Sequence, residues 1–250
     1  MQFAQNKLLN GFEVHSTDEI RESLELGIDP NALIDGKTPM MWLIEMYYRS
    51  NTFSECVRTL VSAGARLEDS CLLAVLLDDS DLLRSEMAKD RDCITRRIEL
   101  RCAFTPLMGA TLLHVAAEYG LVNAASTLLE LGADPNAKAN VDQFGFNGHT
   151  PIFHTVCQHR NCCKPVLELL LSHGADPCVQ LSGISWGKGF EWETTIFDPT
   201  PMSYAQAGLH KQFQRAENDV YENIRLLAKA SRRPLPDDLN VPNRYLHASD

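Results

Sequence analysis

Apolar and polar positions alternate along the chain in a way that predicts pairs of short helices. In the clearest stretch, apolar residues recur at the spacing of one helix face over 112–119 and again over 122–131. Gly120 separates the two segments and Gly132 follows the second. Glycine commonly ends helices because it adopts a positive φ without steric cost. The pattern therefore predicts a hairpin of two helices, with Gly120 in the turn between them.

The turn that follows this hairpin recurs elsewhere in the chain. Leu-Gly-Ala-Asp-Pro-Asn-Ala at 131–137 returns as Leu-Gly-Ile-Asp-Pro-Asn-Ala at 26–32, and in shorter form at 63–66 and 173–177. Four of the expected hairpins also begin with a similar threonine pair: Thr38-Pro39, Thr111-Leu112, Thr150-Pro151 and Thr200-Pro201. Threonine is suited to cap a helix start, and proline to its first position. Self-similarity at this period predicts a stack of helical hairpins.

The sequence resembles the ankyrin repeat family. Thr-Leu-Leu-His-Val-Ala-Ala-Glu-Tyr-Gly at 111–120 and Leu-Leu-Glu-Leu-Gly-Ala-Asp-Pro-Asn at 128–136 follow the pattern of that family, whose repeat is about 33 residues long. The resemblance covers most of 3–230. It implies an all-α fold, an ankyrin-repeat solenoid of stacked helical hairpins, to which we add a β-hairpin-like insertion near the C-terminal end.

The expected units are irregular and number about six. A partial N-terminal cap is expected at 3–31, and the others start near positions 38, 70, 111, 150 and 200, which are 32, 41, 39 and 50 residues apart. The unit at 70 keeps two helices but lacks the Gly-Ala-Asp turn. We expect one repeat domain over 1–230, closed by a capping helix at about 216–230. Prolines and the loss of helical period predict a tail over 231–250.

Composition and charge narrow the class of protein. A hydrophobic content of 44% and a charged content of 22% are typical of a globular chain, whereas a net charge of −10 argues against nucleic-acid binding. No apolar run reaches the roughly 18 residues that span a bilayer, and no signal peptide is evident. We expect a cytoplasmic monomer whose eight cysteines are reduced. Because no catalytic or phosphate-binding motif is present, we expect neither enzymatic activity nor a cofactor.

The resemblance implies a non-catalytic protein–protein interaction module. In ankyrin-like arrays, a partner usually docks on the concave side, which is formed by the hairpin loops and the exposed end of each first helix. No obvious motif in the sequence identifies this partner. Carried over position by position, the expected contact residues are Lys37, Glu45, Met46, Leu107, Met108, Ala110, Glu118, Tyr119, Phe146, Asn147, His149 and Gln158.

The insertion at 178–199 supplies the extra length before the last unit. Ile184-Ser185-Trp186 and Phe190-Glu191-Trp192 are expected as strand arms around Gly187-Lys188-Gly189, since glycine-rich turns between β-prone segments favour a hairpin. One interpretation is an aromatic finger that binds the partner through Trp186, Lys188 and Trp192. The other is a structural lid whose rings fold onto the last two repeats.

A cluster of histidines and cysteines supports an alternative function. His154, Cys157, His159, Cys162 and Cys163 lie close in sequence, and the first two could share one helix face. The alternative is a metal- or small-molecule-binding regulator that uses this 154–163 cluster. However, structural zinc takes about four converging ligands, and the paired spacing of a zinc ribbon is missing here. Incidental thiols near a surface turn are therefore the favoured interpretation.

Overall fold

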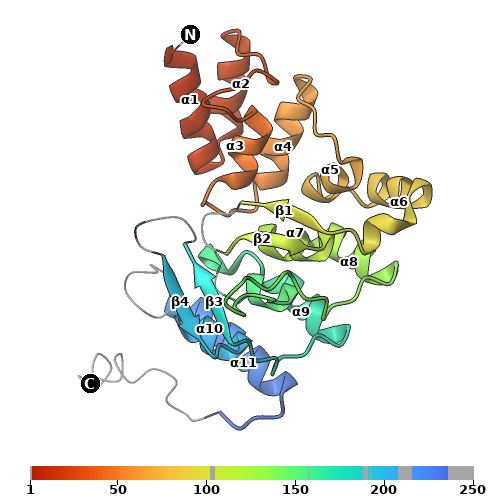
Figure 1. Cartoon of the computed structure of the whole chain (residues 1–250). Coiled ribbons are helices and arrows are strands. Elements are labelled where there is room, and N and C mark those ends of the chain that lie inside the picture. The colour runs from red at the N-terminus through yellow and green to blue at the C-terminus, as the bar shows by residue number, and fades with distance from the viewer. Residues whose placement is uncertain are drawn as a thin grey trace.

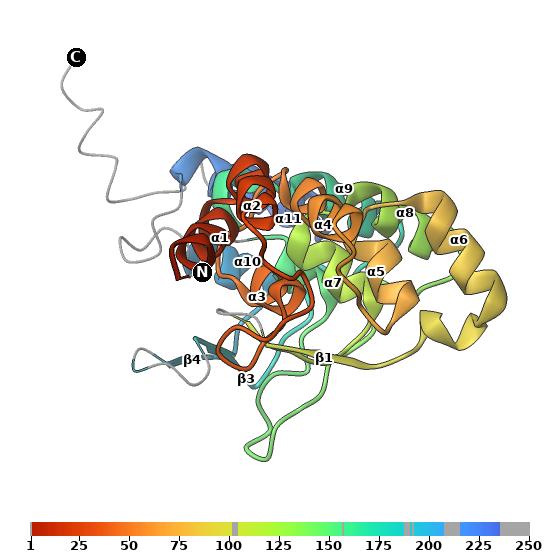
Figure 2. The same ribbon diagram turned by 90° about the horizontal axis from the view of Figure 1, so that it is seen from above.

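The computed structural model describes residues 2–101, 105–156, 158–187, 191, 193–207 and 216–235. Within these ranges, short helices stack from α1 at one end of the molecule to α11 at the other (Figure 1). Two small antiparallel sheets lie along one side of this stack, as the view from above shows (Figure 2). The chain is thus a stack of helices with a strand-bearing loop side.

The first six helices form three hairpins, in which α1 packs on α2, α3 on α4, and α5 on α6. Their bounds are α1 Gln2–Val14, α2 Thr17–Glu25, α3 Pro39–Glu45, α4 Phe53–Ser62, α5 Ser70–Leu76 and α6 Ser80–Lys89. Thr38 caps α3 as expected, since its hydroxyl accepts a hydrogen bond from the Met41 N–H at 3.3 Å. The start of α5 differs slightly, because the cap is Asp69 rather than Ser70.

The remaining elements include helices and two pairs of strands. They are the 3-10 helix η1 Arg91–Ile94, β1 Ile98–Leu100, β2 Leu107–Ala110, α7 Leu112–Tyr119, α8 Val122–Glu130, the 3-10 helices η2 Pro151–His154 and η3 His159–Asn161, α9 Lys164–Ser172, β3 Gly183–Trp186, β4 Thr194–Phe197, α10 Pro201–Ala207 and α11 Glu217–Ala230. The helix expected at 112–119 is confirmed, and Gly120 ends it at φ 69°. On α11, the helix expected as the C-terminal cap, Val220, Ile224 and Leu227 are buried.

Three local expectations need correction. The antiparallel pair of β1 and β2 was not expected in an all-α chain. The strand that pairs with β3 is Thr194–Phe197, whereas the prediction placed it at 190–192, where Phe190 and Trp192 lie outside the described residues. Three β-branched residues followed by phenylalanine explain the observed position.

The third correction concerns the unit at 150, whose first helix is only the single 3-10 turn η2. The Thr155 hydroxyl donates to the Ile152 carbonyl at 2.8 Å. Local side-chain bonds of this kind compete with helix formation.

The stack also departs from a regular solenoid, in which each repeat contacts only its neighbours. Phe53, at the start of α4, stacks on Tyr119 of α7 with ring centroids 4.3 Å apart, although the α5–α6 hairpin lies between them in sequence. The Tyr119 hydroxyl donates to the carbonyl of Ile44 in α3. The α5–α6 hairpin lies to one side of α3, α4 and α7 (Figure 1). Direct contact between nonadjacent units follows from this displacement.

Asparagine side chains tie neighbouring turns together. Asn136 donates to the Gly174 carbonyl at 2.9 Å and accepts from the Asp176 N–H at 2.7 Å. Asn31 makes the same pair of bonds to Gly64 and Arg66. The Asp-Pro-Asn turn therefore contributes to stacking as well as to chain reversal.

We predict that Asn136→Ala lowers the free energy of unfolding by about 1–2 kcal/mol, because it removes both bonds to the next turn. Urea denaturation followed by circular dichroism measures the change. Asn218→Ala, on the exposed face of α11, is the matched control and should stay within about 0.5 kcal/mol of the parent chain. Equal stability of the two variants would show that the asparagine bridges do not support the stack.

Candidate functional site

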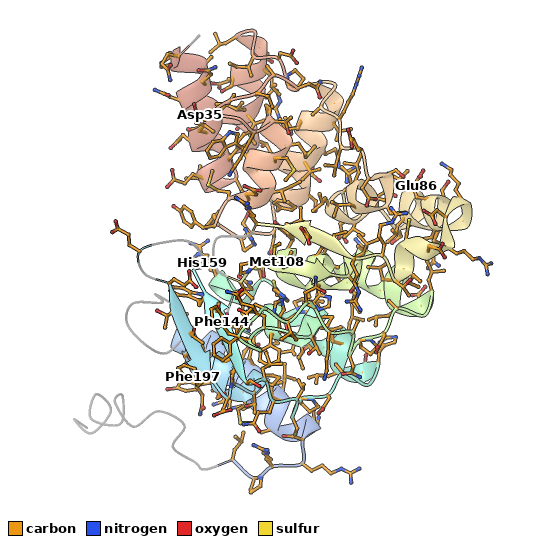
Figure 3. The ribbon with its side chains drawn as sticks, viewed as in Figure 1. Asp35, Glu86, Met108, Phe144, His159 and Phe197 are labelled. Atoms are coloured by element: carbon orange, nitrogen blue, oxygen red, sulfur yellow. The ribbon has the colours of Figure 1, made fainter. Side chains whose placement is uncertain are left out.

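The loop side of the stack carries a group of exposed apolar side chains. Phe144 and Phe197 are each 67% exposed, and Met108 is 39% exposed. Figure 3 shows these three side chains on the strand-bearing part of the molecule. Phe146 lies between the other two phenylalanines, with ring centroids 6.4 Å from Phe144 and 5.6 Å from Phe197. With Val141, which is also exposed, they form what we call the loop-side patch.

One aspartate organises the turn that presents two of these rings. Asp142 accepts hydrogen bonds from the backbone N–H groups of Phe144 and Phe146 at 2.9 and 3.0 Å. Its own N–H donates to the Phe146 carbonyl at 2.9 Å. Asp142 also accepts from the side chain of Asn147. Such Asx-type bonds fix a turn locally, so the backbone that carries Phe144 and Phe146 is held by contacts within the chain.

Asn147 joins this turn to the neighbouring hairpin. Its backbone N–H donates to the Gly183 carbonyl at 2.7 Å, and its side-chain oxygen accepts from the Ser185 N–H at 3.1 Å. The residue has a positive φ of 70°, a conformation that asparagine tolerates better than most residues. The predicted contact residue Asn147 therefore has a structural role within the surface that it helps to form.

A cavity of about 240 Å³ opens beside the patch. Pro106, Met108 and Val141 supply apolar walls, and Asn140 and Asn147 supply amide groups. Its size suits one large side chain, and an apolar pocket with a few polar groups is typical of binding sites. Three residues expected from the sequence, Met108, Phe146 and Asn147, thus come together on one surface.

Several other expected contact residues are buried, and the prediction that they are exposed is wrong. They are Leu107, Ala110, Glu118, Tyr119 and His149. Strand β2 turns Leu107 and Ala110 toward the core. The end of α7 is covered because the segment between α3 and α4 lies against it. The guanidinium of Arg49, from that segment, sits 4.3 Å from the centre of the Tyr119 ring.

The expected residues of the first full repeat form a separate group. Lys37 makes an ion pair with Glu45 and lies over the Trp42 ring, 4.7 Å from its centroid. Met46 is half-buried and packs against the core. This group has its own internal contacts and takes no part in the loop-side patch.

Beneath the surface, one carboxylate collects donors from three parts of the chain. Glu118 accepts from Arg49 Nε at 2.9 Å, from His154 Nδ1 at 2.7 Å and from the Gln158 amide at 3.1 Å. Burial opposes ionisation of Glu118, but the charge of Arg49 and the bond from His154 outweigh it and lower the pKa of the carboxyl. A buried carboxylate must be paired in this way because an isolated charge is very costly away from water. Gln158 is therefore half-buried and bound to Glu118.

Two more histidines pack beside His154, one of the donors to this carboxylate. The rings of His149 and His154 are 4.7 Å apart, and His114 lies 5.9 Å from each. His114 Nδ1 accepts from the Thr111 N–H, so its Nε2 carries the proton and donates to the His149 carbonyl at 3.0 Å. Burial lowers the pKa of His114 to about 3 and that of His149 well below its usual value. His114 and His149 are therefore neutral in the folded chain.

The described members of the 154–163 cluster do not converge on one point, as the metal-binding alternative would require of them. His154 ends the short turn η2 and binds Glu118, while Cys162 and Cys163 have their sulfurs 3.7 Å apart. Cys157 lies outside the described residues. In the part of the chain that the structure describes, no three histidine, cysteine, aspartate or glutamate side chains form a group able to hold a metal ion.

Arg49, Phe144 and Phe197 were not among the residues expected from the sequence to be functional. Phe144 and Phe146 flank a glycine in Asp-Gln-Phe-Gly-Phe, and two aromatics in a turn are a signal of exposed apolar surface that could have been used. No local pattern marked Arg49, which lies 69 positions from its partner Glu118.

We predict that the chain loses stability steeply as the pH falls from about 6.5 to about 4. Burial, aided by the charge of Arg49, lowers the pKa of His15 to about 4, so it joins His114 and His149 as a neutral buried ring. In the unfolded chain all three rings take up protons near pH 6.5. The stability that the neutral, buried rings contribute is therefore fully present above that pH and is lost as the pH falls below it. Three histidines give about 4 kcal/mol per pH unit in the middle of this window.

Urea denaturation at several pH values measures this slope. His149→Phe keeps an aromatic ring at the site without a titrating nitrogen and should reduce the slope by about a third. A free energy of unfolding that stays constant between about pH 6.5 and 5 would contradict the neutral, buried state of the three rings.

A comparison with known protein families finds a match for the central part of the chain. Residues 86–181 match the family model of ankyrin repeats in three copies, and a search of curated proteins finds no match. No helix within the described ranges is long and apolar enough to cross a membrane. The matched range contains the α7–α8 hairpin, the Asn136 bridge and the Asp142 turn. By this match, the central part of the chain, residues 86–181, consists of ankyrin repeats.

Proposed function

We propose that the chain is a non-catalytic protein-binding module whose partner docks on the loop-side patch. The observation that carries this proposal is the exposure of Phe144 and Phe197 on either side of Phe146. Contiguous apolar groups on a protein surface commonly mark interaction sites. Ankyrin repeats are in general protein-interaction modules, which agrees with this use of the surface.

Rigidity of the patch supports a binding role. Asp142 fixes the turn of Phe144 and Phe146, and Asn147 fastens that turn to β3. A surface already in its bound conformation avoids the cost of ordering on association. The adjoining cavity, walled by Met108 and Val141, offers a place for one anchoring side chain of the partner.

The β3–β4 hairpin has features of both interpretations of the insertion, the structural lid and the partner-binding finger. Ile184 of β3 is fully buried, and Ile196 of β4 packs against the core, which supports a structural base. Phe197 points outward, which supports a binding edge. Trp186 is half-buried at the end of β3, whereas Lys188 and Trp192 lie outside the described residues and remain predictions for the tip.

The rest of the proposal follows from the sequence. A cytoplasmic location, a monomeric state and the lack of catalysis stay predictions. Supporting the first of these, the described cysteines are all free thiols, as is usual in reducing compartments.

We predict that Phe144→Ser combined with Phe197→Ser weakens partner capture by about thirtyfold or more, since central aromatic anchors commonly contribute over 2 kcal/mol. The tagged chain is used to capture proteins from a lysate, and each captured protein is quantified by mass spectrometry. Phe3→Ser, on the distant helix α1 and 73% exposed, is the matched control. Circular dichroism checks that all variants keep their helices.

The proposal requires a captured protein that binds the parent chain and the Phe3 variant equally and the double variant poorly. If every captured protein binds the double variant as well as the parent, the loop-side patch is not the docking surface.

A further inference from the structure

The outer edge of strand β4 has backbone groups that the two-stranded sheet does not use. β3 and β4 pair antiparallel, with Gly183 opposite Phe197, Ile184 opposite Ile196, and Ser185 opposite Thr195. Along a strand, successive residues direct their N–H and C=O groups to opposite sides. The direction of each residue in β4 therefore follows once the direction of its partner in β3 is known.

Contacts on both sides of β3 settle these directions. Gly183 and Ser185 bond to Asn147, on the side away from β4. Ser182 accepts from the Asp198 N–H, on the side toward β4. Ile184 consequently faces β4 and pairs with Ile196. The alternation then leaves Thr195 and Phe197 with their N–H and C=O groups directed to the outer edge of β4.

In the part of the chain that the structure describes, no hydrogen bond to the backbone of Thr195 or Phe197 is seen on that edge. Exposed strand edges are usually protected by proline, lysine or a bulge. The segment Thr194–Phe197 contains neither residue, and its register with β3 is regular. The edge is therefore a template for one more strand.

Side chains next to this edge indicate what such a strand would carry. Phe197 and Thr195 lie on one face of the sheet, and Ile196, on the other face, packs against the core. A residue directly opposite Phe197 on an added strand would lie about 5.5 Å away between Cα atoms. Aromatic and β-branched residues are the favoured partners of an exposed phenylalanine in such pairs. Phe146 extends the same apolar face.

The negative charge near β4 indicates which residues would flank the apolar part of an added strand. Exposed carboxylates lie at both ends of β4, Glu193 before it and Asp198 after it, and Asp142 lies in the adjoining turn. The whole chain has a net charge of −10. A segment with lysine or arginine on either side of its apolar residues is complementary to this arrangement.

A second copy of the chain suits this edge poorly. Pairing two β4 strands would bring the Glu193 and Asp198 carboxylates of both copies along one short ladder. Like charges across neighbouring strands are destabilising, and two chains of charge −10 repel each other over longer distances. The edge therefore favours a different, basic protein over self-association.

We propose that an extended, basic segment of a protein partner adds to β4 as a third strand, bonding to Thr195 and Phe197 and placing an aromatic or β-branched side chain beside Phe197. This inference rests on the proposed function, because it specifies the partner for the loop-side patch. It describes an extended ligand held by backbone bonds, with the Phe144–Phe146 turn alongside.

A proline substitution tests the backbone bonds. Thr195→Pro removes an N–H that faces outward, so the β3–β4 ladder keeps its bonds. Thr195→Val keeps the N–H and is the matched control. The probe is a phage-displayed library of random peptides selected on the full chain, and the selected peptides are synthesised for fluorescence anisotropy titrations. Circular dichroism checks the fold of each variant.

We expect selected peptides in which apolar residues alternate with polar ones between basic flanks. Their affinity should fall about tenfold or more with Thr195→Pro, the effect of losing one or two well-formed backbone bonds, and should stay unchanged with Thr195→Val. A second measurement leaves the protein intact. Methylation of the peptide nitrogens that face β4 should weaken binding to a similar extent, and bound peptide should slow amide exchange at Thr195 and Phe197.

Selected peptides that bind Thr195→Pro as tightly as the parent, or a library that yields no binder, would overturn the strand-addition inference. This failure is distinct from failure of the proposed function. If the Phe144 and Phe197 double variant loses partner capture while Thr195→Pro keeps it, the patch remains the docking surface and only the added strand is wrong.

Discussion

The buried carboxylate of Glu118 is the constraint on which the central part of this stack depends. It sits on α7 and draws together Arg49 from the segment between α3 and α4, His154 from η2, and Gln158 from the following turn. Each donor must keep its place, because an unpaired charge in this interior would cost several kcal/mol. The contact also brings the unit at 38 directly against α7, past the displaced α5–α6 hairpin. Helices that are distant in sequence are thereby fixed in one arrangement.

The loop side is held in place by contacts with this interior. His149 packs beside His154 in the core, and its carbonyl accepts from both the His114 ring and the Ala139 N–H. These bonds hold both ends of the segment that carries Asp142, Phe144 and Phe146. An apolar surface can remain exposed on such a segment because its backbone groups are satisfied within the protein rather than by a partner. Core electrostatics and surface presentation are therefore linked through a few residues of one loop.

Local patterns in the sequence predicted the helices well, whereas contacts between distant residues could not be predicted from it. The hairpin around Gly120 follows from apolar spacing and one glycine, so its bounds were accessible. The interior position of Glu118 was not, because a charged residue near a helix end usually faces water, and Arg49 is remote in sequence. Phe146 was predicted to face a partner and lies in the loop-side patch, while Phe197 was missed because the second strand was placed too early. Strand position there depends on pairing with Gly183 and Ile184, which local propensity does not encode.

Native-state hydrogen exchange on the parent chain and on Glu118→Ala tests most directly whether this carboxylate unites the stack. The substitution leaves Arg49 and His154 without their shared acceptor, a loss that commonly costs about 3–5 kcal/mol in a buried site. We expect amides of α3, α4 and α7 to open at similar free energies in the parent chain. In the variant, α3 and α4 should exchange at distinctly lower free energy than α9, because their link to α7 is broken. Uniform exchange in the variant, unchanged from the parent, would contradict the account.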